Sequence, residues 1–196
     1  MENFEGLRIG VGITGSFCTF ETVFDALKAL RAAGAALTCV FSENAQRITS
    51  RFGKPEDFLE RARALSRNPL ILSIAEAEPL GPGNALDLFL IAPCTGNTLA
   101  KLAAGVTDTT VLMAAKGHLR NGKPLLIYLS TNDALGANLK NIGTLLNAKH
   151  IAFVPFAQDA PHKKPNSLVS RPEALGQAIA AVMRGEQLQP LLFVEQ

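Results

Sequence analysis

The sequence has 196 residues, a formal net charge of +2, and 47% hydrophobic and 18% charged residues. Its length suits one folded unit, and we predict a single domain over residues 1–196. Lys and Arg are scattered, with no basic stripe interleaved with aromatic residues, which argues against nucleic acid as a partner. No apolar run reaches the ~18 residues of a membrane span. The cysteines show no metal-ligand spacing, so we expect a cytoplasmic protein without a metal site or a membrane partner.

The charged fraction bears on association. Globular chains average ~25% charged residues, and this chain has 18%. A surface with few charges is typical of a protein whose surface is partly covered by a ligand or by other subunits. We therefore expect a homo-oligomer.

The first half of the chain alternates apolar runs with helical patterns. Residues 7–14 and 36–41 are predicted strands. Residues 20–33 place apolar side chains on one helical face, and residues 55–67 form a charged surface helix. A loop rich in proline and glycine covers 79–83.

The middle of the chain contains the most apolar strand. Residues 87–92 show no alternation, which is typical of a strand buried on both faces of a parallel sheet. A turn follows at 93–98, with predicted helices over 99–104 and 108–117. Residues 124–129 form a further buried strand.

The last part of the chain begins with a polar loop at 130–136, and a helix follows toward Lys149. Residues 151–154 form a short strand, and 173–184 form a closing helix. Between them, 155–172 is predicted to be irregular, as a flap or a subunit-contact loop. Alternating strands and helices predict a three-layer, Rossmann-like or flavodoxin-like α/β fold with a doubly wound parallel sheet.

Small and polar residues follow the first predicted strand. The run from Gly12 to Ser16 lets a phosphate approach backbone N–H groups, and the hydroxyls of Thr14 and Ser16 add donors. Gly15 lies between them. The loop has neither the Lys of a Walker loop nor a full dinucleotide fingerprint. A single phosphate therefore suits this loop better than a pyrophosphate. The alternative is an ordinary tight turn.

Ligands of such sheets bind at the carboxyl ends of the strands. An amide at such an end can pair with the edge of a heterocycle. Alternatively, Thr95 caps the next helix, and the loop after 124–129 forms an Asx turn. Small or polar candidate ligands also follow the predicted strands at 36–41, 87–92 and 124–129: Ser42, Asn44, Pro93, Thr95, Asn97, Thr98, Ser130 and Asn132.

These segments together resemble a known family. Gly15-Ser16 and the run Ala92-Pro93-x-Thr95-x-Asn97-Thr98, continuing through Lys101 to Asp108, are similar to the flavoprotein family of flavin-containing cysteine decarboxylases. The resemblance implies flavin mononucleotide (FMN) as cofactor. It places the phosphate on the first loop and the end of the second strand, and the ring against the Asn97 segment. Of the family's later Pro-x-Met-Asn segment, only Asn132 is kept.

A narrower group, the B subunits of dipicolinate synthases, resembles nearly the whole chain. The quoted stretches are 12–19, 77–82, 111–116, 130–136 and 163–167. This resemblance implies an oxidoreductase subunit that acts with a dehydrogenase-like A subunit, which supplies NADP. Together they form pyridine-2,6-dicarboxylate from a dihydrodipicolinate-pathway intermediate during sporulation, in the mother cell. Its dianionic substrate needs cations, and we predict Lys163 and Lys164 as its ligands, with Arg171 as a weaker candidate.

One departure from the decarboxylases concerns histidine. They carry a catalytic His before the strand at 87–92, and residues 75–87 contain none here. His118 and His150 are expected to be core or surface residues, and His162 lies beside the two lysines. The catalytic residues stay unknown. An FMN-dependent decarboxylase, a prenyltransferase relative and a non-catalytic subunit that stabilises its partner are the alternatives.

Overall fold

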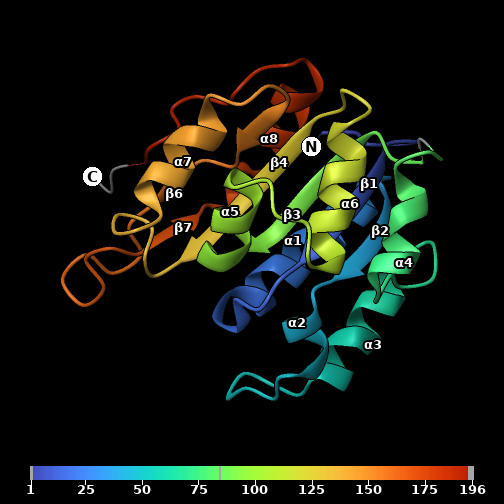
Figure 1. The fold of residues 1–196 in the computed structure, drawn as a ribbon, viewed down its shortest axis with the longest axis horizontal. Helices are drawn as coiled ribbons and strands as arrows, with labels where there is room; N and C mark the ends of the chain where they lie inside the picture. The colour runs from blue at the N-terminus through green and yellow to red at the C-terminus, as the bar shows by residue number, and fades with distance from the viewer. Residues whose placement is uncertain (1, 84, 194–196) are drawn as a thin grey trace.

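The computed structural model describes residues 2–83 and 85–193, and its strands form one sheet (Figure 1). Strands β2, β1, β3 and β4 lie in that order and run parallel, and β5 continues the parallel set along the first half of β4. Strand β7 pairs antiparallel with the second half of β4 and with β6. The strands are β1 (Arg8–Ile13), β2 (Ala36–Phe41), β3 (Leu88–Cys94), β4 (Leu125–Thr131), β5 (Ile151–Phe153), β6 (Phe156–Ala157) and β7 (Leu168–Ser170).

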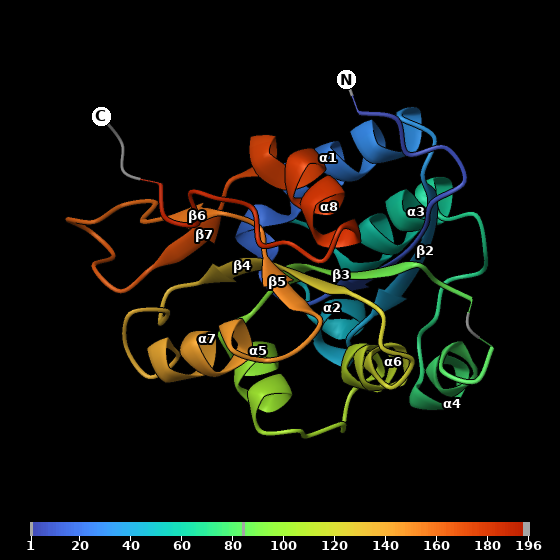
Figure 2. The same ribbon diagram turned by 90° about the horizontal axis from the view of Figure 1, so that it is seen from above.

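Helices cover both faces of the sheet, because each parallel pair needs a crossover. Figure 2 shows α1, α3 and α8 on one face and α5, α6 and α7 on the other. No helix among the described residues is long and apolar enough to cross a membrane. The helices are α1 (Phe20–Ala32), α2 (Glu43–Arg47), α3 (Pro55–Leu65), α4 (Ile74–Ala77), α5 (Gly96–Ala103), α6 (Thr110–Leu119), α7 (Leu139–Leu146) and α8 (Leu175–Met183), with short 3₁₀ turns at Phe17–Thr19, Glu78–Leu80 and Pro172–Ala174.

The predicted parallel sheet is confirmed, and strand β3 shows the physical reason. All its residues are buried. Leu88 and Leu90 pack into the core beneath α1 and α8, whereas Phe89 and Ile91 pack into the core beneath α5 and α6. A strand covered on both faces has no polar positions, so its sequence shows no alternation.

The prediction that 155–172 is irregular is wrong at β6 and β7. Val169 of β7 pairs with Ser130 at the end of β4, and β6 pairs with β7. Strands of two or three residues are too short to show a period of two, so the sequence could not indicate them. This antiparallel pair makes the sheet mixed at one edge.

Two element boundaries and one short helix also differ from the predictions. Helix α5 begins at Gly96, inside the predicted turn, and β3 extends to Cys94. The short helix α4 lies in a stretch for which no helix was expected. A capping box begins it, since Ser73 Oγ accepts from the Glu76 N–H and the Glu76 carboxylate accepts from the Ser73 N–H. That Ser-x-x-Glu signature was readable in the sequence.

The glycines within β1 serve packing. A Cβ at Gly10 would lie 2.6 Å from the Phe89 ring, and one at Gly12 would lie 2.7 Å from Val111 Cγ1. Both glycines therefore let large side chains of β3 and α6 lie against the strand. This agrees with the expectation that they belong to the strand rather than to a dinucleotide loop.

His118 makes stability depend on pH. The side chain is 2% exposed, and its Nε2 lies 2.8 Å from the Pro124 carbonyl oxygen. Burial lowers its pKa below the usual 6.5. The unfolded chain then binds the proton first, so the stability present above pH 6.5 is lost as pH falls through the folded-state value. Urea unfolding at a series of pH values should show a smaller acid-induced loss in His118→Gln. The exposed control His150→Gln should keep the wild-type slope, and an unchanged slope in His118→Gln would contradict the assignment.

Candidate functional site

The carboxyl ends of β1, β2 and β3 surround a pocket of about 320 Å³, called here the edge pocket. This volume falls within the ~300–1,000 Å³ that is usual for ligand sites. The connection after β1 leads to β2 on one side and the connection after β3 leads to β4 on the other, so the pocket lies at the point where the strand order reverses. This is the place expected for a ligand in a doubly wound sheet. The structure brings many predicted residues to its wall: Thr14, Gly15, Ser42, Asn44, Thr95, Asn97 and Thr98.

The hydroxyls of the first loop hold the loop itself. Thr14 is 1% exposed, and its Oγ1 donates to the Pro93 carbonyl (2.7 Å) and accepts from the Thr95 N–H (3.0 Å). Ser16 Oγ lies 2.8 Å from Ser130 Oγ. These bonds join the ends of β1, β3 and β4 into one rigid edge. Thr14 and Ser16 thus shape the pocket through contacts within the protein.

Ser42 differs from these residues. It directly follows β2, is 7% exposed, and its backbone N–H donates to the Ile13 carbonyl. Its hydroxyl has no hydrogen-bond partner among the described residues, and it makes no cap bond to α2. A buried hydroxyl without a partner is unfavourable. In the wall of a pocket, it is a donor placed for a ligand.

The N-terminus of α5 also faces the edge pocket. Thr95 Oγ1 accepts from the Thr98 N–H at 3.2 Å, so Thr95 caps the helix as the alternative interpretation held. Asn97, in the first turn, is exposed and lines the pocket. A helix N-terminus carries partial positive charge and attracts anions. Capping and ligand binding are therefore compatible at this helix.

The site residues predicted from the sequence did not include the charged groups of the edge pocket. Lys101 lines it and forms a 2.7 Å ion pair with Asp108. Glu43 accepts from the N–H and the hydroxyl of Thr110 through Oε1, at 3.0 and 2.9 Å, whereas its Oε2 is buried without a partner among the described residues. The N-terminus of α6 thus offsets the charge of Glu43. Lys101 and Asp108 stood within the family motif, but sequence alone gave no sign that they flank a pocket.

The third predicted loop lies beside the edge pocket rather than in its wall. Ser130 is buried and connects to Ser16 and Thr19 through their side-chain oxygens. Asn132 is exposed, and its Oδ1 accepts from Ser167 Oγ at 3.3 Å. A ligand that extends from the edge pocket across Ser16 would reach this loop.

The predicted substrate lysines lie on the exposed turn between β6 and β7. Lys164 Nζ forms a 2.9 Å ion pair with Asp159, and Lys163 is exposed. His162 is exposed beside them. The turn separates all three from the edge pocket, whose lining includes none of them.

The cysteines near the sheet are not placed for nucleophilic chemistry. Cys94 ends β3 and is fully buried, and burial raises the pKa of its thiol. Burial likewise raises the pKa of Cys39 to about 12. A thiol that stays protonated is a poor nucleophile.

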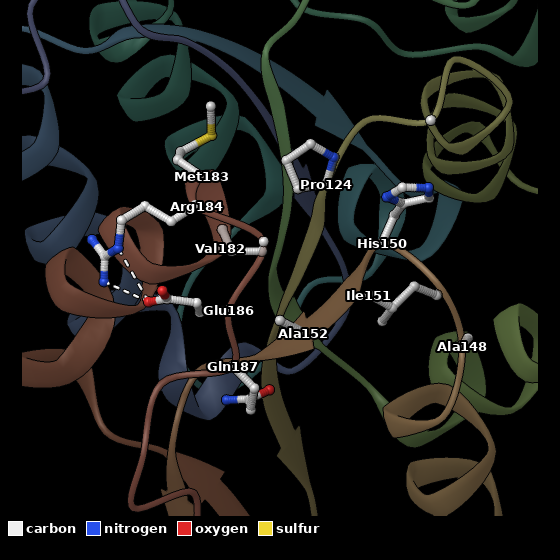
Figure 3. Close-up of a pocket in the computed structure, with 12 residues that line it drawn as sticks. Pro124, Ala148, His150, Ile151, Ala152, Val182, Met183, Arg184, Glu186 and Gln187 are labelled. Carbon is white, nitrogen blue, oxygen red and sulfur yellow. Dashed lines mark hydrogen bonds and ion pairs between the residues drawn. The ribbon is translucent and has the colours of Figure 1, made fainter.

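A larger pocket of about 540 Å³ lies at the opposite edge of the sheet, near the starts of β4 and β5 and the end of α8 (Figure 3). Three of its polar side chains have partners within the protein. Arg184 and Glu186 form an ion pair of 2.8 Å, and the Gln187 amide bonds both the N–H and the carbonyl of Phe153. This pocket lies away from the carboxyl ends of the strands, so we assign the site to the smaller edge pocket.

Comparisons with known proteins agree with this fold. The chain is 45% identical over 192 residues to the dipicolinate synthase B subunit of Bacillus subtilis (strain 168), covering 98% of this chain and 96% of that protein. The crystal structure of the dipicolinate synthase B subunit from Bacillus halodurans matches with a TM-score of 0.90 and 44% identity, over 99% of this chain and 100% of that one. The fold is shared with the FMN-dependent cysteine decarboxylase SpaF, at a TM-score of 0.67 and 19% identity over 91% of this chain and 98% of that one. The family model named Flavoprotein matches residues 1–175, and this chain therefore belongs to the Flavoprotein family.

Proposed function

We propose that this chain is the FMN-binding B subunit of a two-subunit enzyme that forms pyridine-2,6-dicarboxylate, with a dehydrogenase-like A subunit that supplies NADP. The observation that carries the proposal is the similarity to the dipicolinate synthase B subunit of Bacillus subtilis, at 45% identity over 98% of the chain. The word "subunit" in that name supports a partner. Action during sporulation, in the cytoplasm of the mother cell, and assembly into a homo-oligomer belong to the same proposal.

The residues of the edge pocket fit the phosphate of FMN. The buried Ser42 hydroxyl, which has no partner among the described residues, would donate to a phosphate oxygen. The N-terminus of α5 supplies positive charge in the same pocket, and the Lys101 ammonium lies there in its ion pair with Asp108. Phe17 and Asn97 line it as an aromatic face and an amide, which suit the ring system.

The chemistry follows from the substrate class. Forming the aromatic diacid from a hydroxylated tetrahydropyridine diacid requires loss of water and removal of two electrons. When bound, FMN supplies a ring that accepts a hydride. The chain's own part is to bind the phosphate at Ser42, orient the ring with Asn97, and hold the edge rigid through the Thr14 bonds.

Decarboxylation of a cysteine is less well supported. The segment 75–87 contains no histidine. His118 is buried against Pro124 and His150 lies at the opposite edge of the sheet. Neither histidine lines the edge pocket.

The test of the function is reconstitution with the A subunit. We expect pyridine-2,6-dicarboxylate to form only when this chain, the A subunit, NADP and the tetrahydropyridine diacid are combined. Formation at the same rate without this chain would overturn the proposal. Equal rates from FMN-loaded and flavin-free chain would overturn the part assigned to FMN and favour a non-catalytic subunit that stabilises its partner.

Gly15→Ala tests the edge pocket without disturbing the fold. An added Cβ would meet Phe17 Cε2 at 3.6 Å and Asn44 Cβ at 3.7 Å, which are ordinary contacts, so stability should stay near wild type. Because all three residues line the pocket, the methyl group should occupy ligand space. An overpacked contact costs ~1–3 kcal/mol, so FMN affinity should fall by about 5- to 150-fold. Calorimetric titration measures it, and wild-type affinity in a folded Gly15→Ala protein would contradict the placement.

A further inference from the structure

A further, smaller pocket lies between the start of α1, β4 and the β6–β7 pair, and we call it the Tyr128 pocket. Its volume is about 210 Å³, below the ~300–1,000 Å³ usual for drug-sized ligands. It is therefore too small for a flavin and suits one end of a small molecule. Its polar lining comprises Thr19, Thr22, Tyr128, Gln158, Asp159, Ser170 and Arg171, of which the Ser170 hydroxyl is already bonded to two backbone groups.

Tyr128 is the unusual member of this lining. The residue is 1% exposed, and its hydroxyl has no hydrogen-bond partner among the described residues. Burial raises the pKa of this phenol, so the group stays protonated and remains a donor. A buried tyrosine hydroxyl normally has a partner, and its absence in a pocket wall points to an acceptor that the ligand supplies.

The charges of the Tyr128 pocket favour an anion as that acceptor. Arg171 follows β7 and lines the pocket, and its planar guanidinium carries five N–H donors, enough for several acceptors at once. The one acidic group in the described lining, Asp159, is paired with Lys164 at 2.9 Å. Glu173, whose charge also acts on Tyr128, lines a different pocket beside α1. A guanidinium binds a carboxylate through charge-assisted hydrogen bonds, and the phenol hydroxyl adds a further donor in the same pocket.

The Tyr128 pocket is coupled to the edge pocket through one set of hydroxyls. Thr19 lines the Tyr128 pocket, and its Oγ1 lies 3.2 Å from Ser130 Oγ. Ser130 Oγ in turn lies 2.8 Å from Ser16 Oγ, in the loop of the edge pocket. A small molecule held in the Tyr128 pocket therefore lies next to the carboxyl edge where the cofactor is proposed to bind.

We propose that Tyr128 and Arg171 bind one carboxylate of the small dicarboxylate substrate, through the phenol hydroxyl and the guanidinium. This inference rests on the proposed function, since it names how that substrate is recognised. It replaces the exposed Lys163 and Lys164 as the main carboxylate ligands with two side chains that line a cavity.

The chain has one tyrosine and no tryptophan, which gives a direct test. Protein labelled with ¹³C at the tyrosine Cζ shows a single ring signal, and that signal reports hydrogen bonding of the Tyr128 hydroxyl. Titration of the FMN-loaded chain with pyridine-2,6-dicarboxylate should shift the signal to saturation. The neutral pyridine-2,6-dicarboxamide, of nearly the same shape, should not shift it. No saturable shift, or an equal shift with the dicarboxamide, would overturn the inference.

Variants separate the Tyr128 pocket from the cofactor site. Arg171→Gln and Tyr128→Phe should each weaken pyridine-2,6-dicarboxylate binding about tenfold or more in calorimetry, and both should bind FMN as the wild type does. Lys163→Gln, on the exposed turn nearby, should bind both ligands normally. Tyr128→Phe keeps the ring and removes only an unpartnered hydroxyl, so it should fold even where Arg171→Gln does not. If Tyr128→Phe binds pyridine-2,6-dicarboxylate as the wild type does, the assignment of the carboxylate to the Tyr128 pocket is wrong. If the wild-type chain does not bind FMN, only the proposed function is contradicted.

Discussion

Replacing Ser42 with alanine should weaken FMN binding by about 10- to 150-fold. A hydrogen bond to a charged group contributes ~1.5–3 kcal/mol, and each 1.4 kcal/mol is about a tenfold change in Kd. The hydroxyl has no partner among the described residues, so its loss should leave the free energy of unfolding of the flavin-free protein unchanged or slightly higher. Calorimetric titration and urea unfolding measure the two quantities.

Riboflavin is the matched control for Ser42→Ala, because it carries the same ring and lacks the phosphate. Its affinity should be the same in the variant and in the wild type. If FMN and riboflavin lose affinity equally, Ser42 contacts the ring rather than the phosphate. If neither changes, the hydroxyl does not face the ligand and the assignment of the edge pocket fails.

Ser170→Ala should produce the largest loss of stability among the changes considered. Ser170 is 1% exposed, and its Oγ accepts from the Leu129 N–H (2.8 Å) and donates to the Val154 carbonyl (3.0 Å). Alanine leaves both backbone groups buried without a partner, at ~1–3 kcal/mol each. For a chain of this size, where 1 kcal/mol shifts the melting temperature by ~2–4 °C, the melting temperature should fall by about 4–24 °C.

The loss should come with little change in the rest of the fold, because the serine only connects β4 with the segment after β5. Ser50→Ala is a suitable control, since the half-buried Ser50 lies in an exposed loop where water can replace its bonds. Its Oγ donates to the Gly53 carbonyl at 3.4 Å and accepts from the N–H of the exposed Phe52 at 3.1 Å. That variant should stay within ~0.5 kcal/mol of the wild type. Thermal unfolding followed by circular dichroism compares the two. A Ser170→Ala protein as stable as Ser50→Ala would show that water satisfies both backbone groups.

The parallel core of the fold was predictable because burial and sequence agree there. Strands such as β3 are apolar throughout since helices cover both faces, and the helix pattern of α1 has its buried face at Val23, Leu27 and Leu30. The β6–β7 pair was not predictable, because its short strands are held by pairing with β4 rather than by any local pattern. Its existence matters, since it forms one wall of the Tyr128 pocket.

The convergence of the candidate site residues on one edge of the sheet was predictable, whereas their hydrogen bonds were not. The ends of parallel strands meet at one edge, so polar residues after β1, β2 and β3 had to converge. Sequence could not show that the Thr14 hydroxyl bonds to Pro93 and Thr95 while the Ser42 hydroxyl has no partner among the described residues. Nor could it show that Lys101 and Glu43 enter the same pocket, because that depends on how α5 and α2 lie relative to each other.

The most direct test of a phosphate-dependent flavin site is to titrate the purified wild-type chain with FMN and, in parallel, with riboflavin, while the flavin absorbance is recorded. We predict a shifted flavin band and tight binding for FMN, with much weaker binding for riboflavin. Absence of FMN binding, or equal binding of the two compounds, would contradict the assignment of the edge pocket to the phosphate of FMN.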